Sequence, residues 1–155
     1  MRRALALLAL LLLAAAAPAR LTEAHVRAFV AEQAKAWTGD VDAYFATFTP
    51  EARFTDLALA NDNSIVPYGS SSVTEARALV RKSRSQGGFR EDLSVDSVVL
   101  APDGRGARVS AHVVSTAAGR RSCAQRIETV ALTTKGLRAT GQTDTIVRCR
   151  PAPSR

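Results

Sequence analysis

Cysteine and histidine are the side chains that most often bind zinc, and cysteine also supplies redox chemistry. The chain holds two cysteines, Cys123 and Cys149, and two histidines, His25 and His112. Zinc sites take their ligands from closely spaced pairs, typically separated by about two to five residues. These four residues lack any such spacing, so we predict no metal site and no cofactor. The alternative chemistry is a disulfide between the cysteines, which depends on the compartment in which the chain resides.

The N-terminal residues predict export. Arg2 and Arg3 form a positive tip, an apolar run extends from Ala4 to Ala17, and a small-residue cleavage site ends at Ala19. Because the run is shorter than the ~20 residues that span a bilayer, we favour a cleaved signal peptide at 1–19 over a membrane anchor. The sequence therefore predicts a secreted or periplasmic protein with no stable membrane anchor after cleavage.

The remaining residues suit one domain. Removal of 19 residues from 155 leaves 136, enough for a single core, and we expect the domain at 20–150 and a disordered tail at 151–155. The formal charge of +7 comes from arginines spread along the chain. No Phe, Trp or Tyr follows Phe89, whereas nucleic-acid binding needs aromatic side chains interleaved with basic ones. We therefore expect no nucleic-acid partner.

The spacing of Cys123 and Cys149 suits a disulfide in an oxidising compartment. A turn signal at 134–137 lies between two strand-like runs, with one cysteine in each run at a similar distance from the turn. The two cysteines would then face each other across a hairpin. Closing this loop should stabilise the domain by roughly 3 kcal/mol.

Helical patterns fill the first half of the domain. Thr22 is a candidate cap for an amphipathic first helix, Asp40 for a short second helix that includes Phe48, and Ser72 forms a capping box with Glu75 for a third. Between the second and third helices we expect a strand at 52–57 and a polar loop at 58–71.

The second half alternates apolar and polar residues, which is typical of strands. Four such runs, at 93–100, 107–116, 122–133 and 137–147, are separated by turns rich in Gly, Asp or Lys. They predict an antiparallel meander. Helices followed by strands in one small chain predict an α+β domain whose helices cover one face of a curved sheet.

The register of the first two of these strands decides the role of His112. If 102–106 forms the turn, Asp96 lies opposite His112. The other face is then apolar and should pack against the helices; it carries Val95, Val99, Val109, Ala111 and Val113. We therefore expect His112 and Asp96 to point outward, as an ion pair or a dimer contact and not as a catalytic dyad.

The order of elements resembles the nuclear-transport-factor-two-like superfamily, which includes SnoaL-like polyketide cyclases and ketosteroid isomerases. The resemblance covers about 26–148 and rests on this order, on Gly39-Asp40-Val41-Asp42 and on Ala52-Arg53-Phe54-Thr55-Asp56. It implies a cone in which a curved antiparallel sheet wraps an N-terminal helix and leaves an apolar cavity. It also implies a homodimer, which we expect through the outer sheet face. Because this cavity serves enzymes, binding proteins and assembly domains, the fold alone selects no function.

The comparison with ketosteroid isomerases singles out two carboxyl groups. Asp56 lies where these enzymes have their general base, and Glu128 lies near their protonated aspartate, which donates to the oxyanion. An apolar cavity disfavours the ionised form of a carboxyl group, which suits it to either role. Each carboxyl group also has a structural alternative. Asp56 could end its strand. Glu128 would lie opposite Asp144 in the register that joins the cysteines, and Arg126 could neutralise this pair.

The aromatic residues lie between Phe29 and Phe89, so the helical half supplies bulky side chains and the sheet supplies small aliphatic ones. This combination could fill a core or leave a pocket. In a pocket we expect Asp56 and Glu128 as polar groups, and as ligand-binding residues Trp37, Tyr44, Phe48, Phe54 and Tyr68.

Three functions are compatible with these patterns. The first is an exported SnoaL-like domain that binds a small apolar ligand, or a partner, in its cone cavity. The second is a proton-transfer enzyme, an isomerase, cyclase or dehydratase, with Asp56 as base and Glu128 or a tyrosine as donor. The third is a structural or dimerisation domain. A pocket on which Asp56 and Glu128 converge would favour the enzyme, whereas a cavity filled by aromatic side chains would exclude it.

Overall fold

The computed structural model describes residues 20–85, 87 and 89–149. The predicted signal peptide at 1–19 and the predicted tail at 151–155 lie outside the described residues. The elements in chain order are α1 (Glu23–Gly39), α2 (Val41–Phe45), β1 (Phe48–Leu59), β2 (Ile65–Ser72), α3 (Val73–Ser85), β3 (Arg90–Leu100), β4 (Gly106–Ala117), β5 (Arg120–Thr133) and β6 (Gly136–Val147).

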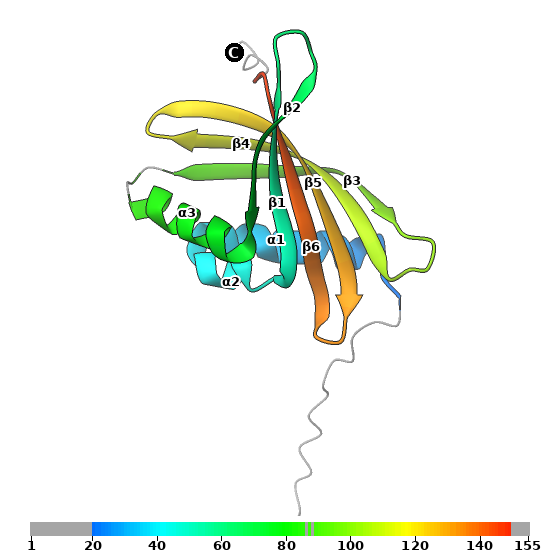
Figure 1. Ribbon diagram of the computed structural model, residues 1–155. Coiled ribbons are helices and arrows are strands. Elements are labelled where there is room, and N and C mark those ends of the chain that lie inside the picture. The colour runs from blue at the N-terminus through cyan, green and yellow to red at the C-terminus, as the bar shows by residue number, and fades with distance from the viewer. Residues whose placement is uncertain (1–19, 86, 88, 150–155) are drawn as a thin grey trace, which may run out of the picture.

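The strands form one curved sheet with the order β2-β1-β6-β5-β4-β3 (Figure 1). Strands β3 to β6 make the predicted antiparallel meander. Strand β1 pairs with β6 in parallel and with β2 in antiparallel orientation, so the first strand of the helical half extends the sheet of the second half. The predicted α+β class is confirmed.

The expected caps begin all three helices. The hydroxyl of Thr22 accepts the backbone N–H of His25, and the carboxylate of Asp40 accepts the backbone N–H groups of Asp42 and Ala43. At the start of α3 the Ser72 hydroxyl accepts the Glu75 N–H, while the Glu75 carboxylate accepts the Ser72 N–H. Each cap satisfies N–H groups that lack a partner within the first turn of a helix.

The prediction that the second helix includes Phe48 was wrong. Helix α2 ends at Phe45, and Phe48 is the first residue of β1, where it pairs with Ala139 of β6. The backbone N–H of Ala139 donates to the carbonyl of Thr47. Phe48 is buried, so tertiary pairing with a distant strand, and not local propensity, places this residue.

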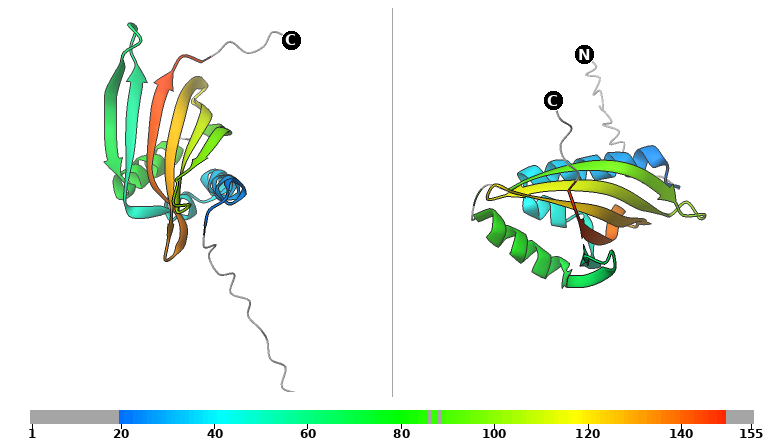
Figure 2. Two further views of the ribbon diagram at one scale, coloured as in Figure 1. Left: turned by 90° about the vertical axis from the view of Figure 1, so that its right-hand side faces the viewer. Right: turned by 90° about the horizontal axis from the view of Figure 1, so that it is seen from above.

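The prediction of a loop throughout 58–71 was also wrong. Strand β1 continues to Leu59, and 65–72 form the edge strand β2, with Ala58 opposite Val66. All of β2 before Ser71 is exposed, so burial imposes no apolar alternation on its sequence. The β1–β2 hairpin projects from the opposite end of the sheet to the helices (Figures 1 and 2).

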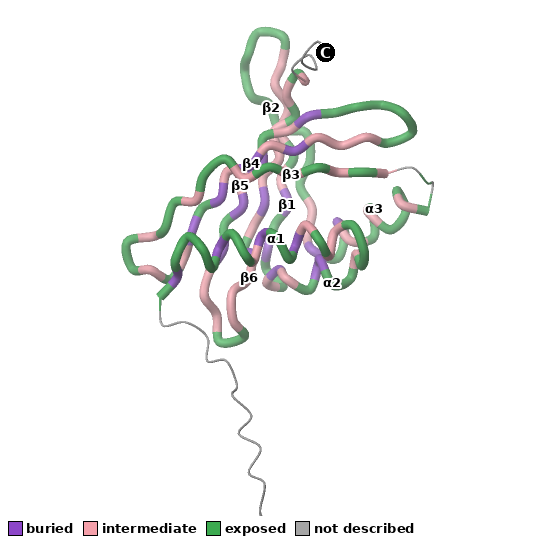
Figure 3. The backbone as a smooth tube through the Cα atoms, turned by 180° about the vertical axis from the view of Figure 1, so that it is seen from behind, coloured by how far each residue is buried: buried purple, intermediate pink, exposed green. Residues whose placement is uncertain are grey.

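The helices and the inner face of the sheet enclose the core. Helix α1 contacts α2 and β3, whereas α3 contacts β1, β2 and α2. Figure 3 shows buried residues on α1, on α2 and along the middle of the sheet, while most of β2 is exposed. The largest buried side chains of this core are Leu21, Val26, Val30, Tyr44, Phe45, Phe48, Phe54, Val73, Val109 and Val130.

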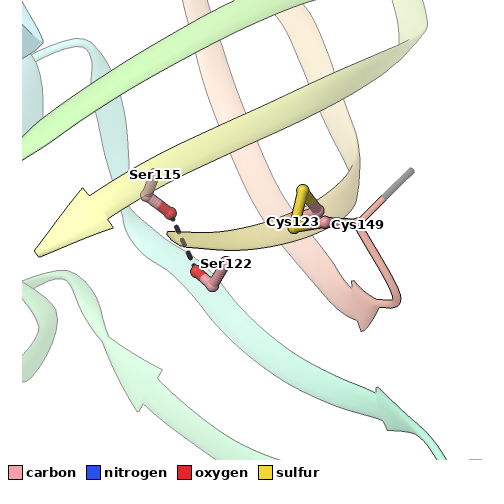
Figure 4. Close-up of a disulfide and its surroundings, with 4 residues drawn as sticks. All are labelled: Ser115, Ser122, Cys123 and Cys149. Atoms are coloured by element: carbon pink, nitrogen blue, oxygen red, sulfur yellow. Dashed lines mark hydrogen bonds between the residues drawn. A yellow bond between two sulfur atoms is a disulfide. The ribbon is translucent and has the colours of Figure 1, made fainter. Parts of the chain in front are cut away.

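Cys123 and Cys149 form the predicted disulfide (Figure 4). The register is not the predicted one, because Cys123 lies opposite Val147, the last residue of β6, and Cys149 follows two residues later. The bond is therefore diagonal. Glu128 consequently lies opposite Gln142 and not opposite Asp144.

A bulge in β3 changes which valine is buried. The register between β3 and β4 shifts between Val95 and Ser97, so Ser94 and not Asp96 lies opposite His112. The Asp96 carboxylate still lies 3.9 Å from Nδ1 of His112, and both side chains are partly exposed. Beyond the bulge Val98 packs against the core and Val99 is 63% exposed, which corrects the prediction that Val99 shares the apolar face.

Candidate functional site

Strand alternation places a group of polar residues on the inner face of the sheet, beneath α1. On β5 the buried residues Arg126, Glu128 and Val130 alternate with outward-facing ones, as the period of two requires. Ala111 and Val109 of β4 lie beside the first two of them. The local sequence of β5 thus directs one positive and one negative side chain into a largely apolar interior.

Arg126 is held by two carboxylates. Its Nε and Nη2 donate to the two carboxylate oxygens of Asp144 at 2.8 Å each, and its Nη1 donates to Oε1 of Glu91 at 3.0 Å. The Arg126 side chain is only 9% exposed. Hydrogen bonding to Asp144 holds the pKa of Arg126 well above its usual value despite burial, whereas burial raises the pKa of Glu91.

A chain of hydrogen bonds joins this ion cluster to α2. The Tyr44 hydroxyl donates to Oε1 of Gln142 at 2.9 Å, and Nε2 of Gln142 donates to Oδ2 of Asp144 at 3.2 Å. Burial raises the pKa of Tyr44 far above its usual value, so its hydroxyl stays protonated as a donor. The amide of Gln142 is thereby oriented from both sides.

Glu128 lies beside the cluster without joining it. Its side chain is buried, and Oε1 has no hydrogen-bond partner among the described residues. The nearby amide of Gln33 donates to the Thr47 hydroxyl. Burial raises the pKa of Glu128 to about 7, and the charge of Arg126 and the nearby Gln33 amide only partly oppose this shift. Near neutral pH this carboxyl group is therefore able to hold or release a proton.

A cavity of about 40 Å³, here called the inner cavity, lies between α1 and the sheet. Glu128, Arg126 and Glu91 provide its charged groups. Trp37, Tyr44, Val30, Leu93 and Val109 provide most of its apolar and aromatic lining, and Gln33, Ala34 and Ala111 complete it. Its volume is enough for about three water molecules or a group of similar size.

A wider hollow of about 230 Å³, here called the outer groove, lies between α3 and the sheet. Asp56 and Asp144 line it, and they are neighbours in the parallel β1–β6 register. Partial burial and the nearby Asp144 raise the pKa of Asp56. The apolar wall of the groove comes from Phe45, Phe54, Ala76, Leu79 and Val80.

Only some of the predicted ligand-binding residues line the same hollow in the structure. Trp37 and Tyr44 line both the inner cavity and the outer groove, Phe54 lines the groove alone, and Phe48 is buried in the core. Tyr68 is 73% exposed on β2 and lines neither hollow.

The two predicted catalytic carboxyl groups lie apart. Asp56 lines the outer groove and Glu128 lines the inner cavity. Phe45, Phe48 and Phe54 pack together in the core, but they leave the inner cavity unfilled.

Sequence reasoning missed Glu91, Gln33 and Gln142 as members of the site. Glu91 shares the inner face with Leu93, and this alternation at the start of β3 was the available signal. Gln33 recurs with Val26 and Val30 on the buried stripe of α1, which the helical spacing does indicate. Gln142 depends on the register of β6 and had no local signal.

Two further findings concern the described residues only. No three His, Cys, Asp or Glu side chains within them are grouped so that they could hold a metal ion. None of the helices found there combines the length and apolar composition that crossing a bilayer requires.

Solved structures show what this chain is similar to. A domain of unknown function with a cystatin-like fold from Nostoc punctiforme aligns with a TM-score of 0.62 and 18% identity, over 82% of this chain and 78% of that one. A nuclear-transport-factor-two-like protein of unknown function from Pseudomonas putida aligns with a TM-score of 0.61 and 7% identity, over 79% and 84%. The β subunit of benzoate 1,2-dioxygenase from Burkholderia mallei aligns with a TM-score of 0.59 and 12% identity, over 82% and 91%.

No protein-family model matches the sequence, and no curated protein matches it. The structural alignments define the class: a cone-like α+β domain with a curved, unclosed sheet. The chain has the nuclear-transport-factor-two-like, or cystatin-like, fold that its resemblance predicted. At these identities the likeness establishes the fold alone, and the function has to be argued from the site.

Proposed function

We propose that this domain binds a small, mainly apolar molecule whose single polar group enters the inner cavity and contacts Glu128. One observation carries the proposal: a buried carboxyl group lines a cavity, and its Oε1 has no hydrogen-bond partner among the described residues. A buried polar group left without a partner costs about 1–3 kcal/mol, and more when it is charged. A ligand that donates to Oε1 would remove that cost.

The shape of the site supports a ligand with a small polar end and an apolar body. The inner cavity accepts a group of a few atoms, and Val30, Leu93 and Val109 line it. Trp37 lines this cavity, the outer groove and a third hollow of about 290 Å³ beside Phe89. The apolar body would lie against Trp37, where burial of apolar surface contributes roughly 25 cal/mol per Å².

The separation of Asp56 from Glu128 favours binding over proton transfer by this pair. A general base and a donor for the developing negative charge must reach the same substrate, each within hydrogen-bond distance. Here the two carboxyl groups line different hollows, with Tyr44 and Arg126 lining both. Export, as predicted from 1–19, would place this binding site in a secreted or periplasmic protein.

Fluorescence of the single tryptophan tests the proposal, because Trp37 lines the inner cavity. Benzyl alcohol serves as a neutral probe with an apolar ring and one hydroxyl group. We expect a saturable change in Trp37 emission upon titration.

Two leucine variants on α1 locate the probe. Ala34→Leu places additional carbon atoms in the inner cavity and should weaken binding at least tenfold, whereas Ala31→Leu, on the exposed face of the same helix, should not. Equal binding by both variants would contradict the proposal, as would the absence of saturable binding by every apolar probe with a single polar group.

A further inference from the structure

The charges around the inner cavity do not balance. Among the described residues that line it, Arg126 is the only basic one, and its Nε, Nη1 and Nη2 all donate to Asp144 or Glu91. Arg84, which does not line the cavity, also acts on Glu91, so two guanidinium groups offset these two carboxylates. Glu128 adds a third acidic group that no basic side chain contacts within the described residues.

The elements packed around Glu128 supply no further cation. Helix α1 presents Val30, Gln33, Ala34 and Trp37, and α2 presents Tyr44. Strands β4 and β6 place Val109 and Gln142 directly beside Glu128. The charged groups that act on Glu128 are thus Arg126 of its own strand and Asp144 of β6, while Glu91 of β3 lines the same cavity.

We propose that the polar group of the ligand is a cation, so that the inner cavity binds the ammonium group of a small apolar amine on the carboxylate of Glu128. This inference rests on the proposed function and specifies the ligand class. An ammonium group supplies the missing positive charge and a hydrogen-bond donor for Oε1 in one compact group. The ring of Tyr44 lines the same cavity and would add cation–π attraction, whereas the ring of Trp37 already has the Arg84 guanidinium group 5.0 Å from its centroid.

The carboxyl groups around the cavity also disfavour anionic and neutral ligands relative to a cationic one. An anionic ligand would meet the two carboxyl groups that line the cavity, Glu91 and Glu128, and an arginine that is already paired. Like charges repel strongly where the dielectric constant is low. A neutral alcohol can donate to Oε1 but leaves the negative charge uncompensated. The expected order of affinity is therefore amine, then alcohol, then carboxylate.

Binding of the amine should also depend on pH. Because burial raises the pKa of Glu128 to about 7, the ionised form predominates only above neutral pH. An alkyl ammonium group stays protonated to about pH 9 or above. From pH 6 to pH 8 the affinity for an amine should therefore rise about tenfold, while the affinity for an alcohol should not rise.

Three matched probes test the inference by Trp37 fluorescence on the full chain: benzylamine, benzyl alcohol and phenylacetate. At pH 8 we expect benzylamine to bind at least tenfold more tightly than benzyl alcohol, and phenylacetate to bind least. Glu128→Gln keeps the shape of the side chain but removes its charge, and should reduce benzylamine to the affinity of the alcohol. The control Glu32→Gln removes an equal charge from the exposed face of α1 and should leave the order unchanged.

The outcomes separate the inference from the function on which it rests. If benzyl alcohol binds, Ala34→Leu blocks it and benzylamine binds no more tightly, the binding function stands and the amine inference is overturned. If the Glu128→Gln variant still prefers benzylamine, the amine inference is overturned as well. If the Asp56→Asn variant then loses this preference, the amine binds in the outer groove. If no probe binds saturably, the proposed function itself fails.

Discussion

Arg126 of β5 lies directly opposite Asp144 of β6, and its guanidinium group donates two hydrogen bonds to that carboxylate, each 2.8 Å long. A third hydrogen bond reaches Glu91 on the edge strand β3. One side chain thereby connects three strands of the sheet across its inner face. The cluster is buried, so its members depend on one another far more than exposed ion pairs do.

Removal of the arginine should therefore destabilise the domain strongly. Arg126→Met leaves Asp144 and Glu91 buried without their shared cation, and we expect a loss of about 3–5 kcal/mol in the free energy of unfolding at pH 8. Part of this loss should be recovered at pH 5, because burial raises the pKa of Glu91 and protonation removes its charge. Urea denaturation at both pH values measures the effect. Arg121→Met, an exposed change on the same strand, should alter stability by less than about 0.5 kcal/mol.

Glu128 should make the domain less stable as the pH rises. Its folded-state pKa of about 7 is above its ordinary value of 4.5, so the folded chain binds the proton more tightly than the unfolded chain does. This contribution is fully present below about pH 4.5 and is lost as the pH rises through 7. The difference corresponds to about 3 kcal/mol.

The isosteric variant Glu128→Gln isolates this contribution. It should be more stable than the unaltered protein at pH 8, and the difference should shrink toward pH 5. Thermal and urea unfolding across this range provide the measurement. An equal slope of stability against pH in the two proteins would show that Glu128 is already ionised at pH 5.

The disulfide should provide a large share of the stability of a domain of this size. Cys123 and Cys149 are 26 positions apart in the sequence, and their bond closes the loop between them. Replacing both with alanine should lower the free energy of unfolding by about 3 kcal/mol. Thermal unfolding with and without dithiothreitol supplies the control. Reduction should lower the Tm of the unaltered protein to that of the double variant and leave the double variant unaffected.

The bulge in β3 gives two adjacent valines opposite environments. Val98 packs against the core, whereas Val99 is 63% exposed. Val98→Ala should lower the free energy of unfolding by about 1 kcal/mol or more, and Val99→Ala by less than about 0.5 kcal/mol. Equal losses in urea unfolding would mean that the strand continues without the bulge.

Local chemistry was sufficient to predict most of the elements. The caps at Thr22, Asp40 and Ser72 and the alternation along β3 to β6 act within a few residues, so their effects are visible in the sequence. The site was predicted less completely. Glu128 and Tyr44 were singled out, but Glu91 and Gln142 acquire a role only because distant strands bring them to Arg126.

The sequence by itself determined the α+β class, the three helix starts, the meander and the pairing of its two cysteines, because each depends on spacing along the chain. The tertiary structure decided the register of the strands. The β5–β6 hairpin is shifted by two residues from the predicted register, so Asp144 lies opposite Arg126 instead of Glu128. It also decided that β1 joins β6 and that Asp56 and Glu128 line separate hollows. Strand register and cavity shape depend on the packing of residues far apart in sequence, and local spacing does not encode them.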